Sequence, residues 1–372
     1  MKNTFINDDK KMAKKSKKDH HHQKDHHHHE CRKKKVLFVL KKKNAYGNPT
    51  SAPYGLKTSC YLVSECLKPY ANCKIVEVID GNSINKEIYD FRPDFVIIEA
   101  IWCPPYKIRE LIRLYPKTQF SIRLHSKFPF LAQEKLALEW MNEYRDFINK
   151  YDNLSISANN EDFIYQINNT LNYAVELLPN CYPIDDSIKQ DKRPVGEILD
   201  IGCFGALRIL KNQLQQAICA IYQADQMKKN LRFHINDSST LEKEGRPILN
   251  NLTNLFKGLK HELIIHTWQD HDSFIDLIKS MDIGMQVSFS ESYDIIAADF
   301  CSNGIPIIGS KEIEFLSSSY QADPNDFYGI VNKLRFAISN KWLGLHRVNE
   351  LRLRNNTKRA VKIWLKYLDI NQ

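Results

Sequence analysis

Short apolar runs alternate with segments of helical periodicity from residue 36 onward, in two successive series. In the first series the apolar runs predict strands at 36–40, 74–80, 94–102, 120–126, 153–159 and 175–180. Residues between them recur at helical spacing, as at Leu56, Cys60, Val63 and Leu67, and helices are also expected at 107–116 and 131–151. Strands separated by helices of this length predict βαβ units and a parallel sheet.

The same pattern starts again after residues 181–197, a polar stretch with two prolines that is typical of a linker. Strands are expected at 197–205, 230–236, 262–268, 283–289 and 305–310. Helices are expected at 211–224, at 272–281 beginning on an Asp cap, after residue 291, and at 348–368. The predicted fold class is therefore α/β, with two Rossmann-like doubly wound domains facing a cleft.

The predicted boundaries follow from these two series. Residues 1–35 form a disordered tail, 36–180 an N-terminal domain, 181–197 the linker and 198–345 a C-terminal domain. A last helix within 346–372 is expected to pack back on the N-terminal domain. Ligands of such folds bind at the carboxyl ends of the strands, where loops and helix N-termini meet.

Size and hydropathy agree with a two-domain protein. The chain has 372 residues, of which 43% are hydrophobic, enough for two cores. No apolar run approaches the roughly 18 residues that span a bilayer, and the N-terminus lacks the apolar centre of a secretory signal. The nine cysteines show no CxxC pair or zinc-like spacing. We expect a cytoplasmic protein, or one peripheral to a membrane, with free thiols.

The formal net charge of +9 lies mostly in the tail. Residues 1–35 hold twelve Lys and Arg against five Asp and Glu, which leaves 41 basic and 39 acidic residues in the rest. The tail also holds seven of the thirteen histidines. It is either a tether for transition metals or polyanions, nucleic acid included, or a low-complexity extension without a ligand.

Two stretches of the C-terminal half carry candidate chemistry. GCFGALRILKNQ at 202–213 puts Arg208 and Lys211 after a glycine-rich strand end, where they would suit a diphosphate, or would be solvated residues of an ordinary turn. SFSESYDIIAAD at 288–299 puts Glu291 in a strand-to-helix loop and Asp299 in the helix. These acids would accept sugar hydroxyls, or would only complement a helix dipole. The sequence contains neither GxxxxGK[ST] nor GxGxxG.

Taken together, the two stretches resemble the GT-B glycosyltransferases, and more narrowly family 4, the "group 1" type. That family carries E-x7-E followed by G-x-P-V-I. Here Glu291 matches the first acid, Asp299 replaces the second Glu, and NGIPII at 303–308 matches the second element. Lys211 lies six residues after Gly205, where the family has a Lys that contacts phosphate. LPN at 178–180 and DPNDF at 323–327 are also similar to the family.

The chain departs from the family pattern at two places. The usual Arg directly after the glycine is Ala206, so either Arg208 substitutes for it from another position or the contact is missing. The usual glycines after the first Glu are replaced by Ser292, Tyr293 and Asp294, which narrows or alters the donor pocket.

In the N-terminal half the resemblance points to three further positions. Gly55 would lie in a loop that faces the donor phosphates and the acceptor. His125, at a strand end, would contact the donor sugar, or would be a histidine bonded to backbone. Glu99, ending another strand, would meet an acceptor.

The resemblance implies a metal-independent, retaining transfer of a sugar from a UDP- or GDP-linked donor, without a further cofactor. The predicted catalytic residues are Glu291, His125, Lys211 and Arg208. The predicted donor-binding residues are Asp299, Gly205, Lys211, Arg208, Ser292, Tyr293 and Gly55. The acceptor would be a glycan, a lipid-linked molecule or a protein. The alternative is a weakened GT-B-like protein that binds a nucleotide or glycan without turnover.

Overall fold

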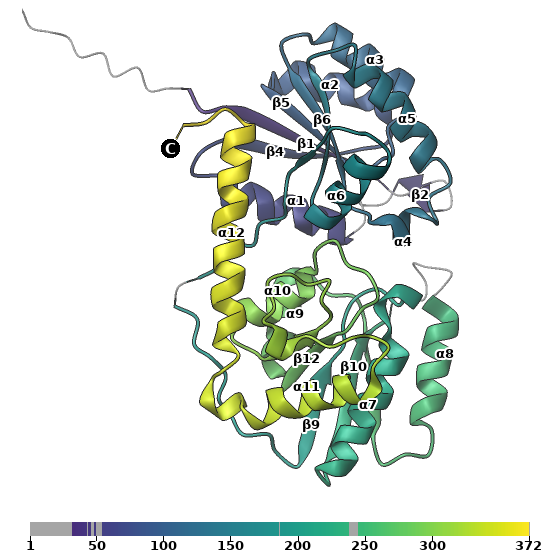
Figure 1. Cartoon of the computed structure of the whole chain (residues 1–372), viewed down its shortest axis with the longest axis vertical. Coiled ribbons are helices and arrows are strands. Elements are labelled where there is room, and N and C mark those ends of the chain that lie inside the picture. Colours follow the sequence, from purple (N-terminus) through teal and green to yellow (C-terminus); the bar gives the residue numbers. More distant parts are fainter. Residues whose placement is uncertain are drawn as a thin grey trace, which may run out of the picture. The chain divides into compact units, whose positions relative to one another are not determined.

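The computed structural model describes residues 32–42, 44–45, 48–49, 54–185, 187–237 and 245–371. The predicted tail therefore lies outside the described residues, apart from its last four. Residues 33–372 form one compact unit, and within it two parallel sheets each carry their own helices (Figure 1). We call these the N-lobe and the C-lobe.

The N-lobe is built on a six-stranded sheet in the order β4-β1-β5-β6-β7-β8. All its pairings are parallel. Its strands are β1 (Lys35–Lys41), β4 (Asn72–Val78), β5 (Phe95–Glu99), β6 (Gln119–Leu124), β7 (Leu154–Ala158) and β8 (Val175–Leu177). Its helices are α1 (Tyr54–Leu67), α2 (Ile84–Phe91), α3 (Pro105–Leu114), α4 (Phe128–Leu131), α5 (Ala137–Ile148) and α6 (Glu161–Thr170). Because helices cover both faces, a central strand such as β1 is a continuous apolar run, fully buried from Val36 to Leu40.

The C-lobe is built on a five-stranded parallel sheet in the order β11-β10-β9-β12-β13. Its strands are β9 (Ile198–Gly202), β10 (Asn230–Asn236), β11 (Glu262–His266), β12 (Ile283–Gln286) and β13 (Ile307–Gly309). Its helices are α7 (Gln213–Gln226), α8 (Gly245–Phe256), α9 (His271–Ser280), α10 (Ile295–Ser302) and α11 (Phe327–Ser339). The predicted α/β class with two doubly wound halves is confirmed.

Three expected elements differ in detail. The helix expected at 131–151 is two helices, α4 and α5, with Gln133–Leu136 outside both. The helix expected to begin on Asp272 begins one residue earlier, because Asp270 caps it by accepting from the Ser273 N–H. The strand expected at 283–289 ends at Gln286, which leaves the following residues free to form the loop that carries Glu291.

The linker is fastened to the C-lobe. The Asp191 N–H donates to the Gly304 carbonyl at 2.8 Å, and Lys341 forms ion pairs with Asp191 at 2.9 Å and Asp282 at 3.1 Å. Gly304 has a φ of +68°, and a Cβ there would lie 2.4 Å from the Lys189 carbonyl oxygen. A glycine is required at this point because both the backbone angle and the close approach exclude a side chain.

The last helix, α12 (Arg347–Tyr367), runs beside both lobes (Figure 1). Leu353 packs in a C-lobe cluster, whereas Trp364 and Leu365 pack with Val36 and Phe38 of the N-lobe. The Trp364 indole N–H donates to the Pro179 carbonyl at 2.8 Å. The exact domain boundaries stay a prediction. No helix among the described residues is long and apolar enough to cross a membrane.

We expect Trp364→Ala to lower the free energy of unfolding by about 3–5 kcal/mol, because it removes a fully buried indole and leaves a cavity against Phe38. Urea denaturation followed by circular dichroism measures this. The control is Lys362→Ala on the same helix, where the side chain is exposed and the expected change is below about 0.5 kcal/mol. Equal effects of the two substitutions would contradict the packing described.

Candidate functional site

The predicted C-lobe residues meet at the carboxyl edge of its sheet. Lys211 ends a short 3-10 helix that follows β9, and Glu291 lies in the loop between β12 and α10. The Lys211 ammonium is 2.6 Å from a Glu291 carboxylate oxygen and 3.2 Å from one of Asp294. The three side chains are largely buried. The structure therefore brings Lys211 and Glu291, 80 positions apart in sequence, into direct contact.

The electrostatics of this cluster depend on burial. Burial raises the pKa of Glu291 to about 7, against the opposing pull of Lys211 and with added repulsion from Asp294. Burial also acts to lower the pKa of the Lys211 ammonium, but the Asp294 and Glu291 carboxylates outweigh it and raise that pKa. Lys211 is thus a fixed cation at neutral pH, beside a carboxyl group poised to change its protonation.

Asp294 is a member of this cluster that sequence reasoning did not assign as an acid. It is the N-cap of α10, where its side chain accepts from the Ala297 N–H at 2.8 Å while the other carboxylate oxygen faces Lys211. An Asp directly before the apolar run IIAADF is a capping signal and could have been found. Its pairing with Lys211 required the fold.

Asp299 is placed differently from the expectation of an open sugar-binding acid. It is almost fully buried within α10, where it accepts from the Tyr182 hydroxyl at 2.6 Å and contacts the His271 ring at 3.0 Å. Burial raises the pKa of Asp299 in spite of these partners, and the hydrogen bond to Asp299 raises the pKa of His271. In this geometry the partly exposed His271 lies between Asp299 and solvent.

The N-lobe contributes a second cluster, at the ends of β5 and β6. His125 contacts the Glu99 carboxylate through Nε2, and the same carboxylate accepts from Arg123 at 3.1 and 3.2 Å. Burial acts to raise the pKa of Glu99, but the charges of Arg123 and His125 and the hydrogen bonds that Glu99 accepts together outweigh it and hold the pKa below its usual value. Burial lowers the pKa of His125. A neutral His125 then donates from Nε2 to Glu99, which leaves Nδ1 as an acceptor.

Arg123 is the residue of this cluster that sequence reasoning missed. It is completely buried, donates to the Leu178 carbonyl at 2.8 Å and to the Asn180 side chain, and lies over the Trp364 ring at 5.3 Å. The available signal was a lone charge inside the apolar strand FSIRL. A buried charge must be paired, so that position implied a partner.

Direct contacts join the two clusters across the lobes. Asn159, after β7, lies 3.5 Å from His125 Nδ1 and donates to the Ser292 hydroxyl at 3.4 Å. Lys127 forms an ion pair of 2.7 Å with Glu312, whose same carboxylate oxygen accepts from the Glu291 N–H at 3.2 Å. The loop that carries Glu291 is therefore held from the N-lobe side.

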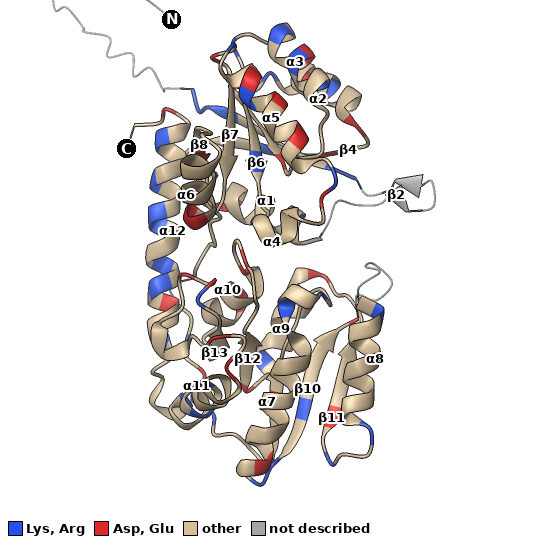
Figure 2. Cartoon of the chain, turned by 45° about the vertical axis from the view of Figure 1, so that its right-hand side comes forward, with Lys and Arg blue, Asp and Glu red and all other residues tan. Residues whose placement is uncertain are grey.

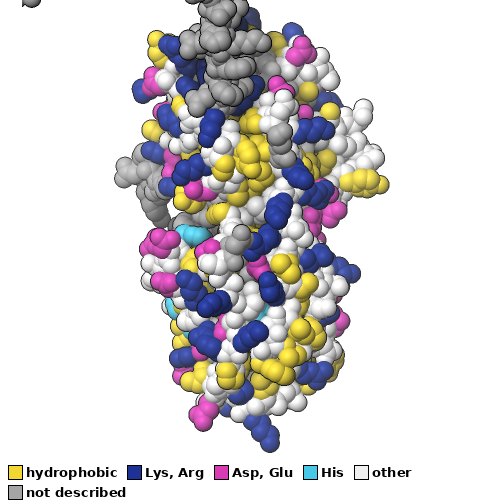
Figure 3. Space-filling model, turned by 90° about the vertical axis from the view of Figure 1, so that its left-hand side faces the viewer, with side chains coloured by type: hydrophobic (Ala, Val, Ile, Leu, Met, Phe, Trp, Pro, Cys, Tyr) yellow, Lys and Arg dark blue, Asp and Glu magenta, His cyan; other side chains and the backbone are white. Residues whose placement is uncertain are grey.

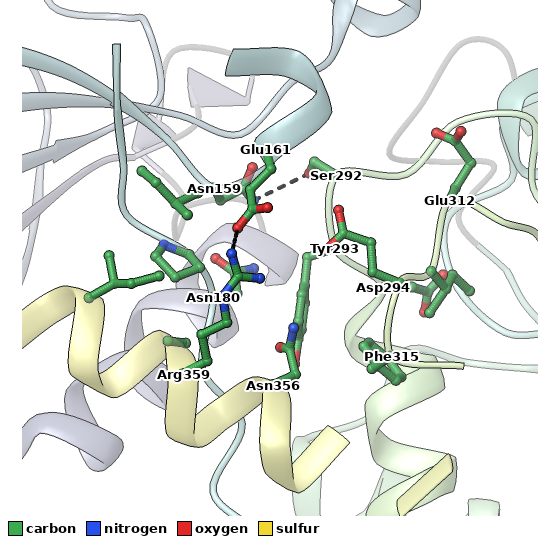
Figure 4. A pocket seen from close by; sticks show the side chains of 16 residues that line it. Asn159, Glu161, Asn180, Ser292, Tyr293, Asp294, Glu312, Phe315, Asn356 and Arg359 are labelled. Carbon is green, nitrogen blue, oxygen red and sulfur yellow. Dashed lines mark hydrogen bonds and ion pairs between the residues drawn. The ribbon is translucent and has the colours of Figure 1, made fainter. Parts of the chain in front are cut away.

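A cavity of about 30 Å³ lies beside this junction, lined by residues of both lobes and of α12 (Figure 4). Ser292, Tyr293 and Asp294 form one wall, and Glu161 pairs with Arg359 of α12 at another (Figure 4). The Tyr293 ring lies 5.6 Å from that of Phe315. Since one ordered water needs about 10–15 Å³, the space holds about two or three waters and not a nucleotide sugar.

The remaining predicted residues lie around the clusters. The Arg208 guanidinium stacks over the Phe130 ring of the N-lobe at 4.9 Å. Gly205 has a φ of +106° and donates its N–H to Asn236 at 3.0 Å. Gly55 lies in the first turn of α1 and not in the expected loop, because the helix already begins at Tyr54. A Cβ on Gly55 would contact nothing, so no close approach requires glycine there.

No group of three or more His, Cys, Asp or Glu among the described residues is arranged to hold a metal ion. The histidine-rich part of the tail lies outside those residues.

Comparison with known proteins gives a match in structure only. No family model and no curated protein matches this sequence. Solved structures do match. One is an E. coli structure named for trehalose-6-phosphate and bound with UDP-2-fluoro glucose, at 10% identity and a TM-score of 0.64, covering 90% of this chain and 98% of that one.

A glycosyltransferase from Rickettsia africae matches at 12% identity and a TM-score of 0.63, covering 91% and 98% of the two chains. A UDP-forming trehalose-phosphate synthase from Burkholderia xenovorans matches at 10% identity and a TM-score of 0.59. The match covers 91% of this chain and 99% of that one. The fold is GT-B-like. Identities this low show the fold of the chain and leave its place within family 4 a prediction.

For this GT-B-like chain we expect the buried Glu291 to make stability fall as pH rises. Its folded pKa of about 7 lies above the usual 4.5, so the native state holds the extra proton between those values. Relative to Glu291→Gln, the wild-type protein should lose about 1–3 kcal/mol of unfolding free energy between pH 4.5 and 7.5.

Urea denaturation of both proteins across this pH range measures the difference. The exposed Glu143→Gln serves as control and should track the wild type at every pH. A Glu291→Gln curve parallel to that of the wild type would contradict a raised pKa.

Proposed function

We propose that this chain is a glycosyltransferase that moves a sugar from a nucleotide-diphosphate donor to an acceptor, with retention and without a metal. The main support is the pairing of two charged clusters across the lobes, Lys211–Glu291–Asp294 and Arg123–Glu99–His125, joined by Asn159 and Ser292. Several structural neighbours are named as trehalose-phosphate synthases that are UDP-forming or act with retention. The resemblance to family 4 supports the same activity.

In this proposal Lys211 contacts the donor diphosphate. A fixed ammonium in a largely buried site stabilises the negative charge that builds on the leaving diphosphate. Lys211 is already held in place by two carboxylates, so little freedom remains to be lost when the donor binds. Arg208, on the same loop and stacked on Phe130, would act with it.

Glu291 and His125 would face the transferred sugar. The raised pKa of Glu291 lets this carboxyl either donate to or accept from a sugar hydroxyl near neutral pH. His125, with Nε2 committed to Glu99, offers Nδ1 as an acceptor for another hydroxyl. A donor must displace the contacts that close this junction, including those of Ser292 and Glu312, so binding and domain opening would be coupled.

One observation favours the alternative of a protein that binds without turnover. Asp299, the counterpart of the family's second Glu, is almost fully buried, and both Tyr182 and His271 contact its Oδ1. In that case a nucleotide or glycan would bind beside Lys211 and leave unchanged.

We expect purified protein to release UDP or GDP from one member of a nucleotide-sugar panel, and Lys211→Met to lower the rate about 100-fold or more. A coupled assay of nucleotide release measures turnover, and thermal shift with each nucleotide sugar measures binding. Lys211→Met should abolish the shift together with the rate.

Lys341→Met is the matched control, because Lys341 is also a buried ammonium between two carboxylates but lies at the linker. It should lose stability and keep both turnover and the thermal shift. Binding without nucleotide release would support the alternative. Neither binding nor release with any donor would reject both the transferase and a protein that binds nucleotides.

A further inference from the structure

Exposed apolar side chains are concentrated in residues 342–351, which lead into α12 and form its first turn. Trp342 is 64% exposed, and Leu343, Leu345, Val348 and Leu351 are 38–45% exposed. Exposed apolar residues are normal when scattered, but a group of this size on one segment marks a contact surface.

The exposed side of α12 continues from this group as a row of cations. At 100° per residue, Val348, Leu351, Lys358, Lys362 and Lys366 fall within an arc of about 80° on the helix. Leu353, Ala360 and Trp364, which fall on the opposite side, are buried against the lobes. The helix thus has one face buried against the lobes. Its other face is exposed, apolar at the start of the helix and cationic toward its end.

The charge of the three lysines on this face is uncompensated. Residues 351–368 hold six Lys and Arg and no Asp or Glu, but Arg354 pairs with Glu350 and Arg359 with Glu161. Within the described chain the ammonium groups of Lys358, Lys362 and Lys366 make no hydrogen bond or ion pair. Figure 2 shows Lys and Arg along the length of α12, and Figure 3 shows them gathered beside hydrophobic groups on that side of the molecule.

We propose that this face, Trp342 to Lys366, is the surface by which the protein lies on a lipid bilayer that contains anionic lipids. Trp and Leu side chains would enter the headgroup region, while the Lys row would contact lipid phosphates. Lys34, near the start of the described chain, lies 3.9 Å from Asp369, just beyond the Lys end of the helix.

Two other occupants fit the face less well. A nucleic acid would use the cations, but its backbone offers nothing to exposed Leu and Val side chains. A second copy of the chain would use the apolar group, but its own face offers no exposed carboxylate to the Lys row, because Glu350 is buried and paired with Arg354. A bilayer with anionic headgroups satisfies both halves of the face.

The test uses the full chain in flotation assays with phosphatidylcholine vesicles that contain about one third phosphatidylglycerol. The wild type should bind these vesicles and bind pure phosphatidylcholine at least about tenfold more weakly. Lys358→Glu/Lys362→Glu/Lys366→Glu should weaken binding at least about tenfold. Trp342→Ser/Leu345→Ser should also weaken it, and should remove the part of the binding that survives high salt.

The control variants carry the same number and type of substitutions elsewhere on the surface. Lys117→Glu/Lys150→Glu/Lys257→Glu and Tyr89→Ser/Tyr106→Ser alter exposed residues outside the face and should bind as the wild type does. Brominated phosphatidylcholine should quench tryptophan emission of the wild type and fail to quench it in Trp342→Phe.

Three results would overturn the proposal. The first is equal binding by the face variants and their controls, which would assign binding to the basic tail. The second is that the triple Lys→Glu variant keeps the vesicle binding of the wild type but loses affinity for duplex nucleic acid. The third is that the wild type does not float with the vesicles but forms dimers, and that Trp342→Ser/Leu345→Ser dissociates these dimers.

Discussion

The complete burial of the Arg123 guanidinium constrains the N-lobe more than any other single interaction described. Removing such a charge from water costs several kcal/mol unless its donors are all used. The partners come from separate parts of the chain: the Glu99 carboxylate from β5, the Leu178 carbonyl and Asn180 from the segment after β8, and the Trp364 ring from α12. One side chain therefore fixes where the chain leaves the N-lobe and where the last helix returns to it.

The same pairing prepares the candidate site. Because Arg123 holds Glu99 ionised, Glu99 can accept from His125 and set the orientation and tautomer of its ring. On the other side, Lys211 orders two carboxylates in the same way. Each lobe thus presents a charge cluster assembled at the carboxyl edge of its own sheet. Asn159 and Ser292 join them, so that movement of the lobes would change the site directly.

Some residues of the candidate site could be predicted from the sequence, and others could not. Glu291 was found because a strand-to-helix loop after an apolar run must lie at the sheet edge, and Lys211 because it follows a glycine-rich strand end. The hydrogen bond from Tyr182 to Asp299 could not be predicted from the sequence, because Tyr182 lies in the linker, 117 positions away. The helix expected at 131–151 was also wrong in length, because a turn at 132–136 interrupts it and the periodicity gives no sign of that turn.

The sequence by itself determined the two βαβ series, the linker between them and the loop positions of the candidate acids. Hydrophobic periodicity and turn residues are local, and they fix which segments are buried and which face a sheet edge. Only the tertiary structure decided which charges meet. It made Glu291 a carboxyl with a pKa of about 7, gave Arg123 its partners and left the Lys row of α12 open. Pairing and desolvation depend on neighbours distant in sequence, and these are set by packing.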